Sequence, residues 1–584
     1  MSPLHSNFKH LIRILLFFLS VPNGYAAHPD GYAVASAHPL ATNAGLEMLA
    51  AGGNAFDAAI AVSAVLAVVA PYHSGLGGGG FWLLHQEALH QDTFIDGRET
   101  APLASTKTMF LDKEGKPIPL LSLNGGLAAA IPGEPAALVL IAEQFGRLPL
   151  TQTLAPAIRL AESGFPVDFQ LNRFLTMGDR IEQIKKHQGS VKVFLHDGKP
   201  YQTGEQLIQH DLARTLRLLA EKGHDGFYKG EIAERLVKAV NQAGGKWSMK
   251  DLALYKVKIR KPLHGTFHDM HIVTAPPPSE GGVNFLLMLQ ILSSYPLDTW
   301  SKVQWVHYVV ESMRLSFWQV SQLLGDPDFV QIPIKSILSE KNKAYLQSFI
   351  KKDRATKSAT LAQKTPPEAS SDNTTHFSII DKEGNRVSAT LTINYIFGSS
   401  VVADGTGVLL NDEMDDFAIK PGTMNVYGLV GGQSNQIEPG KRPSSSMTPT
   451  FLETPGRVAI LGTPGGSRIP TMVLLAALAF HDSFGAISMV SLMRFHHQYL
   501  PDQLQFEPDT FSKELQKELE HMGYQLAPLP EYFGDMQAIT WDQKNHLLTA
   551  ASDPRHIGLG AVVGQPLSYG LMYNKNTCAE PCVQ

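Results

Sequence analysis

Residues 373–394 of the 584-residue chain read NTTHFSIIDKEGNRVSATLTIN. Polar and apolar residues alternate on both sides of a turn at Glu383-Gly384-Asn385, which predicts a β-hairpin with strands over 375–381 and 386–393. Thr374 stands where the first strand begins. Because threonine often opens a strand, the hairpin by itself does not make this side chain reactive.

The residues before the hairpin give Thr374 a possible chemistry. Residues 351–373 contain one large apolar residue, Leu361, and we expect a mobile linker that cannot bury enough surface to fold alone. A threonine hydroxyl is a poor nucleophile unless a base lies beside it. Cleavage between Asn373 and Thr374 would create an α-amine with a pKa of about 7.7–8.0, which supplies that base.

The N-terminus is typical of an export signal. Two basic residues precede an eight-residue apolar run over 14–21, and Gly24 and Ala26 are small residues suited to cleavage after Ala26. The run is far shorter than the roughly 20 residues that span a bilayer, so a signal peptide over 1–26 is favoured over a membrane anchor. We therefore expect a periplasmic or secreted protein.

Composition excludes several classes of protein. The chain has 49 Lys and Arg against 54 Asp and Glu, a net charge of −5, so it is not a strongly basic nucleic-acid binder. The chain contains no run of five residues of like charge, so a polybasic membrane-binding patch is not expected. The two cysteines, Cys578 and Cys582, are too few for a disulfide-rich scaffold or a four-cysteine zinc site, although they could pair within the tail.

Two other patterns favour structure over cofactor binding. Gly75–Gly80 matches G-x-G-x-x-G, but a helix and Pro71 precede it in place of a strand, so a tight backbone turn is the better interpretation. His264, His268 and His271 lie in a predicted hairpin where they do not all share one face. We expect no metal and no cofactor.

The rest of the chain alternates between helical and extended patterns, which predicts layered sheets with helices, a mixed α and β fold. Predicted helical regions are 41–51, 55–70, 134–245, 284–324 and 470–479, and extended regions are 255–276 and 457–462.

Ordered motifs along the chain resemble those of the γ-glutamyltranspeptidases. They are GGNAFDAA (52–59), SGLGGGGFW (74–82), DGRETAP (96–102), PPPSEGG (276–282), TTHFS (374–378), GNRVSATLT (384–392), LLNDEMDDF (409–417), NVYGLVGG (425–432), KRPSSSM (441–447), GTPGGSRI (462–469), RFHHQYLPD (494–502) and SDPR (552–555). The resemblance implies an N-terminal-nucleophile hydrolase, an α+β protein with an αββα four-layer sandwich formed by two chains from one precursor. The large subunit would span 27–373 and the small, catalytic subunit 374–584.

The same resemblance implies roles for individual residues. Thr374 would attack the Asn373 carbonyl during processing and the substrate carbonyl afterwards, and Thr392 would orient the new amine. The backbone N–H groups of Gly465 and Gly466 would form the oxyanion hole. The substrate α-carboxylate would bind Arg98, Ser445 and Ser446, the α-ammonium would bind Asn394, Glu413 and Asp416, and Tyr427 would lie in a lid.

Two positions depart from the pattern that the resemblance suggests. Glu280 stands where a second serine is frequent, and Gly97 stands where a bulkier residue is usual. Neither position carries an implied role in the chemistry.

The expected function is that of an exported γ-glutamyltransferase and glutathione hydrolase. It would cleave glutathione and other γ-glutamyl compounds through a γ-glutamyl-Thr374 ester and pass the acyl group to amino acids, dipeptides or water. We expect no nucleic-acid or membrane partner. One alternative within the same fold is an acylase for glutaryl-type side chains, such as a cephalosporin acylase. Another class, a periplasmic solute-binding protein, would have no reason to keep Thr374 behind a cleavable linker.

Overall fold

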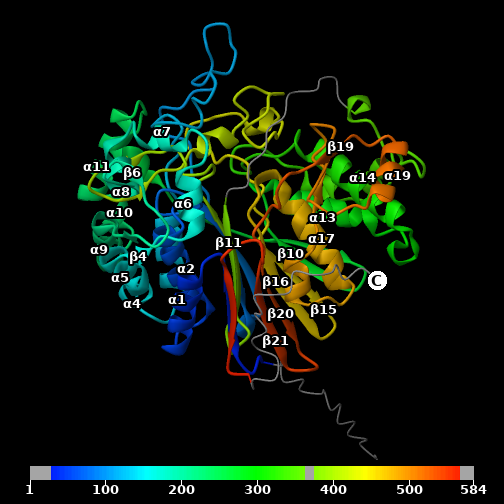
Figure 1. Cartoon of the computed structure of the whole chain (residues 1–584), viewed down its shortest axis with the longest axis horizontal. Coiled ribbons are helices and arrows are strands. Elements are labelled where there is room, and N and C mark those ends of the chain that lie inside the picture. The colour runs from blue at the N-terminus through cyan, green and yellow to red at the C-terminus, as the bar shows by residue number, and fades with distance from the viewer. Residues whose placement is uncertain (1–27, 362–373, 566–584) are drawn as a thin grey trace, which may run out of the picture.

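The computed structural model describes residues 28–361 and 374–565. Two antiparallel sheets lie against each other in the centre, with helices on both outer faces (Figure 1). This is the expected αββα sandwich. The predicted signal peptide, the residues from 362 to Asn373, and the two cysteines lie outside the described residues.

The first sheet has seven strands and contains the predicted hairpin at its centre. In spatial order the strands are β22 (Leu559–Val563), β1 (Tyr32–Ser36), β11 (Thr375–Ile380), β12 (Arg386–Thr392), β2 (Gly79–Gln86), β3 (Gln91–Gly97) and β8 (Lys258–Arg260).

The second sheet has six strands. In spatial order they are β21 (Leu547–Ser552), β20 (Gln537–Asp542), β16 (Arg457–Gly462), β15 (Thr450–Thr454), β10 (Met270–Thr274) and β9 (Leu263–Phe267).

The β11–β12 hairpin is confirmed, and its turn is held by one carboxylate. Asp381 accepts hydrogen bonds from the N–H groups of Glu383 and Asn385 at 2.9 and 3.0 Å. Gly384 supplies a φ of 87°, which favours glycine. Asp381 also accepts from the Ala55 N–H at 2.9 Å, so the same side chain ties the hairpin to the start of α2.

The period-two alternation of the strands separates two apolar layers. Val34 and Trp82 pack against the helices over one face of the first sheet, whereas Ala33 and Phe81 join the core between the two sheets. On the β11–β12 hairpin the inward face carries the hydroxyls of Ser378 and Ser388 as well as the apolar Ile380. The Ser388 hydroxyl donates to the Leu461 carbonyl of the second sheet at 3.0 Å, which fixes the hairpin against that sheet.

The helix layer on the first sheet begins with α1 (Pro39–Ala50) and α2 (Ala55–Val69), close to their predicted ranges. Asn54 and Asp57 form a capping box at the start of α2, and every residue of this alanine-rich helix is buried. The other helices of this side, from the predicted helical region and just beyond it, are α3 (Glu134–Gln144), α4 (Leu150–Thr153), α5 (Ala155–Ser163), α6 (Phe169–Leu175), α7 (Arg180–Ile184), α8 (Gln188–Phe194), α9 (His210–Lys222), α10 (Asp225–Tyr228), α11 (Gly230–Gln242) and α12 (Met249–Leu254).

The helix layer on the second sheet contains α13 (Glu280–Leu292), α14 (Lys302–Val320) and α17 (Ile469–His481). The prediction of one helical stretch over 284–324 is wrong in detail, because the segment that contains Pro296 separates two helices. Smaller helices around this layer are α15 (Ile334–Ile337), α16 (Glu340–Gln347), α18 (Ala486–Val490) and α19 (Lys513–His521).

The first part of the predicted linker is packed, which corrects that prediction for residues 351–361. The Ser358 side chain is buried, its hydroxyl accepts a hydrogen bond from Arg314 at 2.7 Å, and its N–H donates to Asp502 at 2.8 Å. Polar contacts with distant residues therefore hold a segment whose composition predicts mobility.

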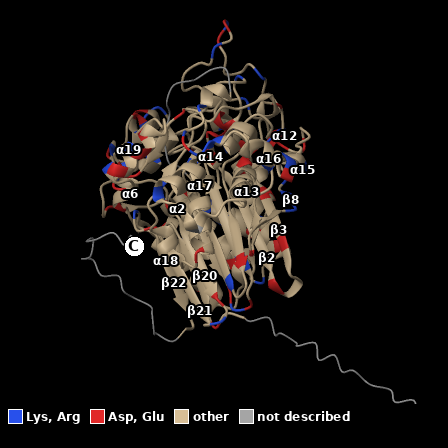
Figure 2. Cartoon of the chain, turned by 90° about the vertical axis from the view of Figure 1, so that its right-hand side faces the viewer, with Lys and Arg blue, Asp and Glu red and all other residues tan. Residues whose placement is uncertain are grey.

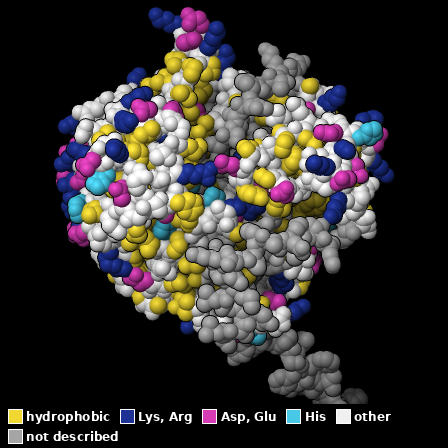
Figure 3. All heavy atoms as spheres, viewed as in Figure 1, with side chains coloured by type: hydrophobic (Ala, Val, Ile, Leu, Met, Phe, Trp, Pro, Cys, Tyr) yellow, Lys and Arg dark blue, Asp and Glu magenta, His cyan; other side chains and the backbone are white. Residues whose placement is uncertain are grey.

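Charged side chains lie mainly on the outer helices and loops, and the strands carry few of them (Figure 2). On the face shown in Figure 3, basic and acidic side chains are interspersed. None of the helices formed by the described residues combines the length and the hydrophobicity needed to cross a lipid bilayer.

Candidate active site

Two threonines lie side by side at the end of the β11–β12 hairpin. Thr374 immediately precedes β11 and Thr392 is the last residue of β12, so the antiparallel register places them side by side. The Thr374 hydroxyl donates to the Thr392 hydroxyl oxygen at 3.3 Å, and both side chains are buried. Thr392 also accepts from the Asn394 N–H at 2.8 Å, which fixes its orientation.

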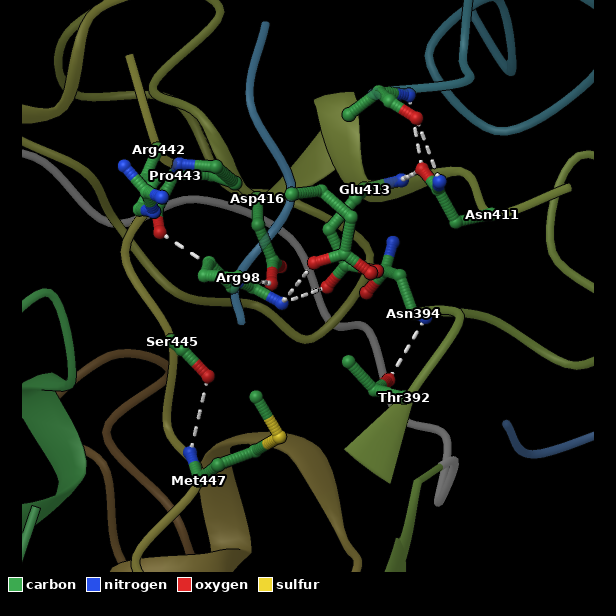
Figure 4. Close-up of polar contacts among 12 residues, drawn as sticks. Arg98, Thr392, Asn394, Asn411, Glu413, Asp416, Arg442, Pro443, Ser445 and Met447 are labelled. Atoms are coloured by element: carbon green, nitrogen blue, oxygen red, sulfur yellow. Dashed lines mark hydrogen bonds and ion pairs between the residues drawn. The ribbon is translucent and has the colours of Figure 1, made fainter. Parts of the chain in front are cut away.

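Arg98 follows β3 and is fully buried beside two acidic side chains (Figure 4). Its guanidinium donates to the carboxylate of Glu413, to Asp416 Oδ2 at 2.5 Å and to the Ser444 carbonyl at 2.7 Å. A further bond joins its Nε to the Pro443 carbonyl at 3.3 Å. The groups that the resemblance assigns to opposite charges of a substrate are thus in direct contact.

Burial and charge act against each other in this cluster. Burial lowers the pKa of Arg98, but the carboxylates of Glu413 and Asp416 more than offset it, so the guanidinium stays charged. Burial raises the pKa of Glu413, and Arg98 opposes that shift. The neighbouring Glu99 lies 3.6 Å from the guanidinium, and burial raises its pKa to about 8.

Four buried oxygens of Glu99, Asn394 and Glu413 have no hydrogen-bond partner among the described residues: both carboxyl oxygens of Glu99, Asn394 Oδ1 and Glu413 Oε2. Of these residues, Asn394 and Glu413 line the pocket described below. The Asn394 amide is oriented by a bond from its Nδ2 to the Asp412 carbonyl at 3.0 Å, and its φ of 69° turns the chain after β12. Because unpaired buried acceptors are costly, the unpaired oxygens of Asn394 and Glu413 suit a ligand that donates hydrogen bonds.

The serines of the 441–447 segment lie against the start of α13. Ser445 forms a bridge with Ser279, and its hydroxyl accepts from the Met447 N–H at 3.2 Å (Figure 4). The Ser446 hydroxyl donates to Glu280 Oε1 at 3.3 Å. Sequence reasoning gave Glu280 no role, and its departure from the motif was the only signal.

The two glycines of the implied oxyanion hole connect β16 to α17. Their φ values are 136° for Gly465 and 53° for Gly466, a region that favours glycine. A Cβ atom on Gly466 would lie 2.4 Å from the ring of Tyr427, so the glycine also makes room for that ring.

Tyr427 is held at both ends. Its hydroxyl donates to the Asn394 carbonyl at 2.8 Å, and its own carbonyl accepts from Gln498 Nε2 at 3.0 Å. Gln498 accepts in turn from the Ser467 hydroxyl at 2.5 Å, which links the loop of Tyr427 to the segment of the two glycines. Gln498 lies in the quoted RFHHQYLPD motif, but the sequence alone gave it no function.

One pocket collects these groups. Asn373 lies outside the described residues. All of the other predicted site residues line this pocket except Gly465. Much of the remaining lining is apolar and includes Phe317, Ile419, Met424 and Val430. The arrangement joins a hydroxyl, a guanidinium and unpaired acceptors in one pocket with an apolar side.

The glycine-rich pattern that matches a cofactor motif has a structural explanation. The Gly75–Gly80 turn packs closely against other backbone, since a Cβ atom on Gly77 would lie 1.9 Å from the Leu409 carbonyl oxygen. Across residues 28–361 and 374–565, no three or more His, Cys, Asp or Glu side chains are grouped to hold a metal ion.

The chain is similar to several known proteins. The family model described as Gamma-glutamyltranspeptidase matches residues 41–563. A glutathione hydrolase proenzyme from Pseudomonas sp. (strain A14) is 40% identical over 549 residues, covering 93% of this chain and 92% of the relative. A cephalosporin acylase structure from Bacillus halodurans has a TM-score of 0.80 at 26% identity, covering 91% and 96% of the two chains. A Helicobacter pylori γ-glutamyltranspeptidase structure has a TM-score of 0.54 at 36% identity, covering 57% of this chain and 94% of the other.

Proposed function

The chain belongs to the γ-glutamyltranspeptidase family, and from that membership we propose which of its residues perform each step. It is a self-processing γ-glutamyl hydrolase and transferase with the fold of an N-terminal-nucleophile hydrolase. Glutathione and other γ-glutamyl amides are the donors, and amino acids, dipeptides or water are the proposed acceptors.

Processing separates residues 27–373 from residues 374–584 at the Asn373–Thr374 bond. The Thr374 hydroxyl attacks the Asn373 carbonyl, and the peptide C–N bond breaks, which leaves an ester on Thr374 Oγ1 and frees the Thr374 α-amine. Hydrolysis of that ester then frees the Asn373 carboxylate and the Thr374 hydroxyl. The φ of 137° at Thr374 supports this site, because a β-branched residue rarely adopts that backbone conformation and cleavage removes the constraint.

Catalysis then uses the new terminus. Thr374 Oγ1 adds to the γ-glutamyl carbonyl while the α-amine takes its proton, with Thr392 orienting the amine. The N–H groups of Gly465 and Gly466 stabilise the oxyanion. Collapse releases the amine leaving group with that proton and leaves a γ-glutamyl ester on Thr374. An acceptor amine or water attacks the ester and restores the threonine.

Recognition of the donor depends on its α-amino acid head. The unpaired oxygens of Asn394 and Glu413 are the observation that carries the proposal, since an ammonium group would satisfy both. Asp416 adds a second negative charge, and Arg98 with Ser445 and Ser446 binds the α-carboxylate. When the head binds, its two charges compensate the groups that pair with each other in its absence.

The glutaryl acylase remains the competing function because of the likeness to cephalosporin acylase. A glutaryl group lacks the ammonium, so its binding would leave the acceptors of Asn394 and Glu413 unpaired. Sites built around a polar partner reject analogues that lack it by about 10⁴–10⁵-fold. Because part of the pocket admits solvent, we expect γ-glutamyl-p-nitroanilide to exceed glutaryl-p-nitroanilide by at least about 10²-fold in kcat/KM.

The test combines processing with this pair of substrates. Purified protein should run as two chains, with the small chain beginning at Thr374. T374A should remain uncut, while T374S should be processed because a hydroxyl remains. Equal rates on the two anilides would favour the acylase. A single uncut wild-type chain without activity would favour a solute-binding protein.

We also propose export, to the periplasm or the medium, from the N-terminal pattern of two basic residues, an apolar run and small residues before position 27. Intact-mass measurement of the exported protein should place its N-terminus at Ala27. An N-terminus at Met1 would contradict the signal-peptide assignment.

A further inference from the structure

We propose that Glu280 is a substrate-binding residue whose carboxyl must carry a proton when the donor's α-carboxylate binds. The proposal rests on the function above and adds a proton to the recognition step. It makes affinity for the γ-glutamyl head fall as pH rises through neutrality.

Glu280 is fixed beside the serines that bind the carboxylate. It is the first residue of α13, its side chain lines the same pocket as Arg98 and Thr374, and Ser446 donates a hydrogen bond to its Oε1 at 3.3 Å. Its N–H donates to the Ser445 carbonyl at 2.8 Å. The contact is also sterically fixed, since a Cβ atom on Gly281 would lie 2.2 Å from the Ser446 carbonyl oxygen.

In this arrangement the Glu280 carboxyl and the substrate α-carboxylate would both lie next to the Ser446 hydroxyl. A bound α-carboxylate at Ser445 and Ser446 would approach the Glu280 carboxyl that Ser446 already contacts. Two carboxylates that share a site repel each other unless one is protonated. A protonated Glu280 would instead donate a hydrogen bond to the substrate carboxylate, a strong charge-assisted bond.

The charges around Glu280 favour the protonated form. Burial and the nearby Asp416 carboxylate raise its pKa to about 7, while Ser446 and Arg98 act in the opposite direction. The helices α14 and α17 pack against α13 and contribute the uncharged Phe317 and Ile469 to the pocket.

The other neighbours of α13 lie farther along the helix. Gln347 of α16 donates to the Ile291 carbonyl near its C-terminal end, and Leu286 packs on Gly265 of β9. The balance at Glu280 is therefore set by Arg98, Asp416 and Ser446.

The net charge of the occupied pocket also depends on the bound ligand. Arg98 is the cation that lines the pocket, it already contacts Glu413 and Asp416, and a zwitterionic head adds no net charge. An ionised Glu280 would therefore add a negative charge that no cation lining the pocket is left to compensate. Proton uptake on binding avoids this cost.

The experiment measures the inhibition constant of L-glutamate against γ-glutamyl-p-nitroanilide hydrolysis at pH 6, 7 and 8. If only protonated Glu280 admits the ligand, the fraction that is competent falls and the wild-type constant rises about tenfold over this range. E280Q cannot ionise, so its constant should change at least fivefold less. E340Q is the matched control, because Glu340 also follows a capping serine at the first position of a helix but is exposed. It should behave as wild type.

A second ligand isolates the α-carboxylate. 4-Aminobutanoate keeps the ammonium and the γ-carboxylate of glutamate, and its inhibition should have the same pH dependence in wild type and E280Q. The Thr374 amine titrates in both proteins, so its effect cancels in the comparison.

Two outcomes would overturn the proposal. Equal pH dependence of the glutamate constant in wild type and E280Q would show that Glu280 does not couple a proton to binding. Weaker glutamate binding by E280Q, to the same extent at pH 6 and at pH 8, would show that an ionised Glu280 attracts the ligand, as a contact with its ammonium group would, and does not need a proton. In both cases a wild type that hydrolyses the anilide leaves the proposed function intact, and a wild type without activity at pH 6–8 would instead reject that function.

Discussion

Replacing Gly466 by alanine should slow catalysis through the ring of Tyr427. The added Cβ atom would lie 2.4 Å from Cδ1 and 2.7 Å from Cε1 of that ring. Carbon atoms in contact are normally about 3.5–4.0 Å apart, so the ring or the glycine segment must move by roughly 1 Å. The ring is restrained by bonds from the Tyr427 hydroxyl to Asn394 and from Gln498 to the Tyr427 carbonyl. Much of the shift should therefore fall on the Gly466 N–H.

The magnitude follows from the role of that N–H. Loss of one oxyanion donor costs about 10²–10³ in kcat, or roughly 2.7–4 kcal/mol, and a 1 Å misplacement costs about 10². We expect kcat to fall by about 10²–10³ with a smaller change in KM. The φ of 53° adds a backbone penalty of about 1–2 kcal/mol to folding.

The assay is p-nitroaniline release by G466A enzyme that has formed two chains. Gly523 is the matched control, because its φ is 94° and a Cβ atom there would meet nothing within 4 Å. G523A should keep the wild-type kcat while sharing the backbone penalty. In a Y427A background the ring is gone, so adding G466A should cost much less. Wild-type kcat in G466A, or the same cost with and without the Tyr427 ring, would refute this reasoning.

Two further substitutions test the charged groups. R98K should lower kcat/KM by about 5- to 150-fold, roughly 1–3 kcal/mol, and should leave processing intact. The reason is that lysine lacks the forked guanidinium that contacts both Glu413 and Asp416. Unchanged kinetics would reject the role of Arg98. Burial raises the pKa of Glu134 to about 8, whereas a glutamate in the unfolded chain has a pKa of about 4.3. Between about pH 4 and 8 the folded protein therefore keeps a proton that the unfolded chain releases, and the stability of the folded protein falls as the pH rises through this range. E134Q should therefore raise Tm more at pH 8 than at pH 5, and an equal change at both would contradict this.

Local patterns predicted the elements well because their causes are local. The alternation around Glu383–Asn385 defines the β11–β12 hairpin, and Asn54 with Asp57 marks the start of α2. Where a distant partner decides the outcome, the prediction was wrong. The composition of residues 351–361 predicts a mobile segment, yet hydrogen bonds with Arg314 and Asp502 hold Ser358 in place.

The same distinction between local and distant causes applies to the residues of the site. Sequence motifs identified the pocket residues by type, and the family resemblance implied that Thr392 acts next to the new amine of Thr374. They could not show that Arg98 pairs with Glu413 and Asp416, more than 300 residues away, or that Glu280 contacts Ser446.

The hairpin and the layered α and β pattern could be predicted from the sequence, because alternation, capping and turn formation depend on neighbours along the chain. The candidate nucleophile came from the ordered motifs that resemble a known family. Only the tertiary structure decided which charges meet, which acceptors remain unpaired and how Gly466 accommodates Tyr427. Those properties depend on burial and on contacts between segments that are remote in sequence, since a buried charge or acceptor is stabilised or left unpaired by whatever the fold places beside it.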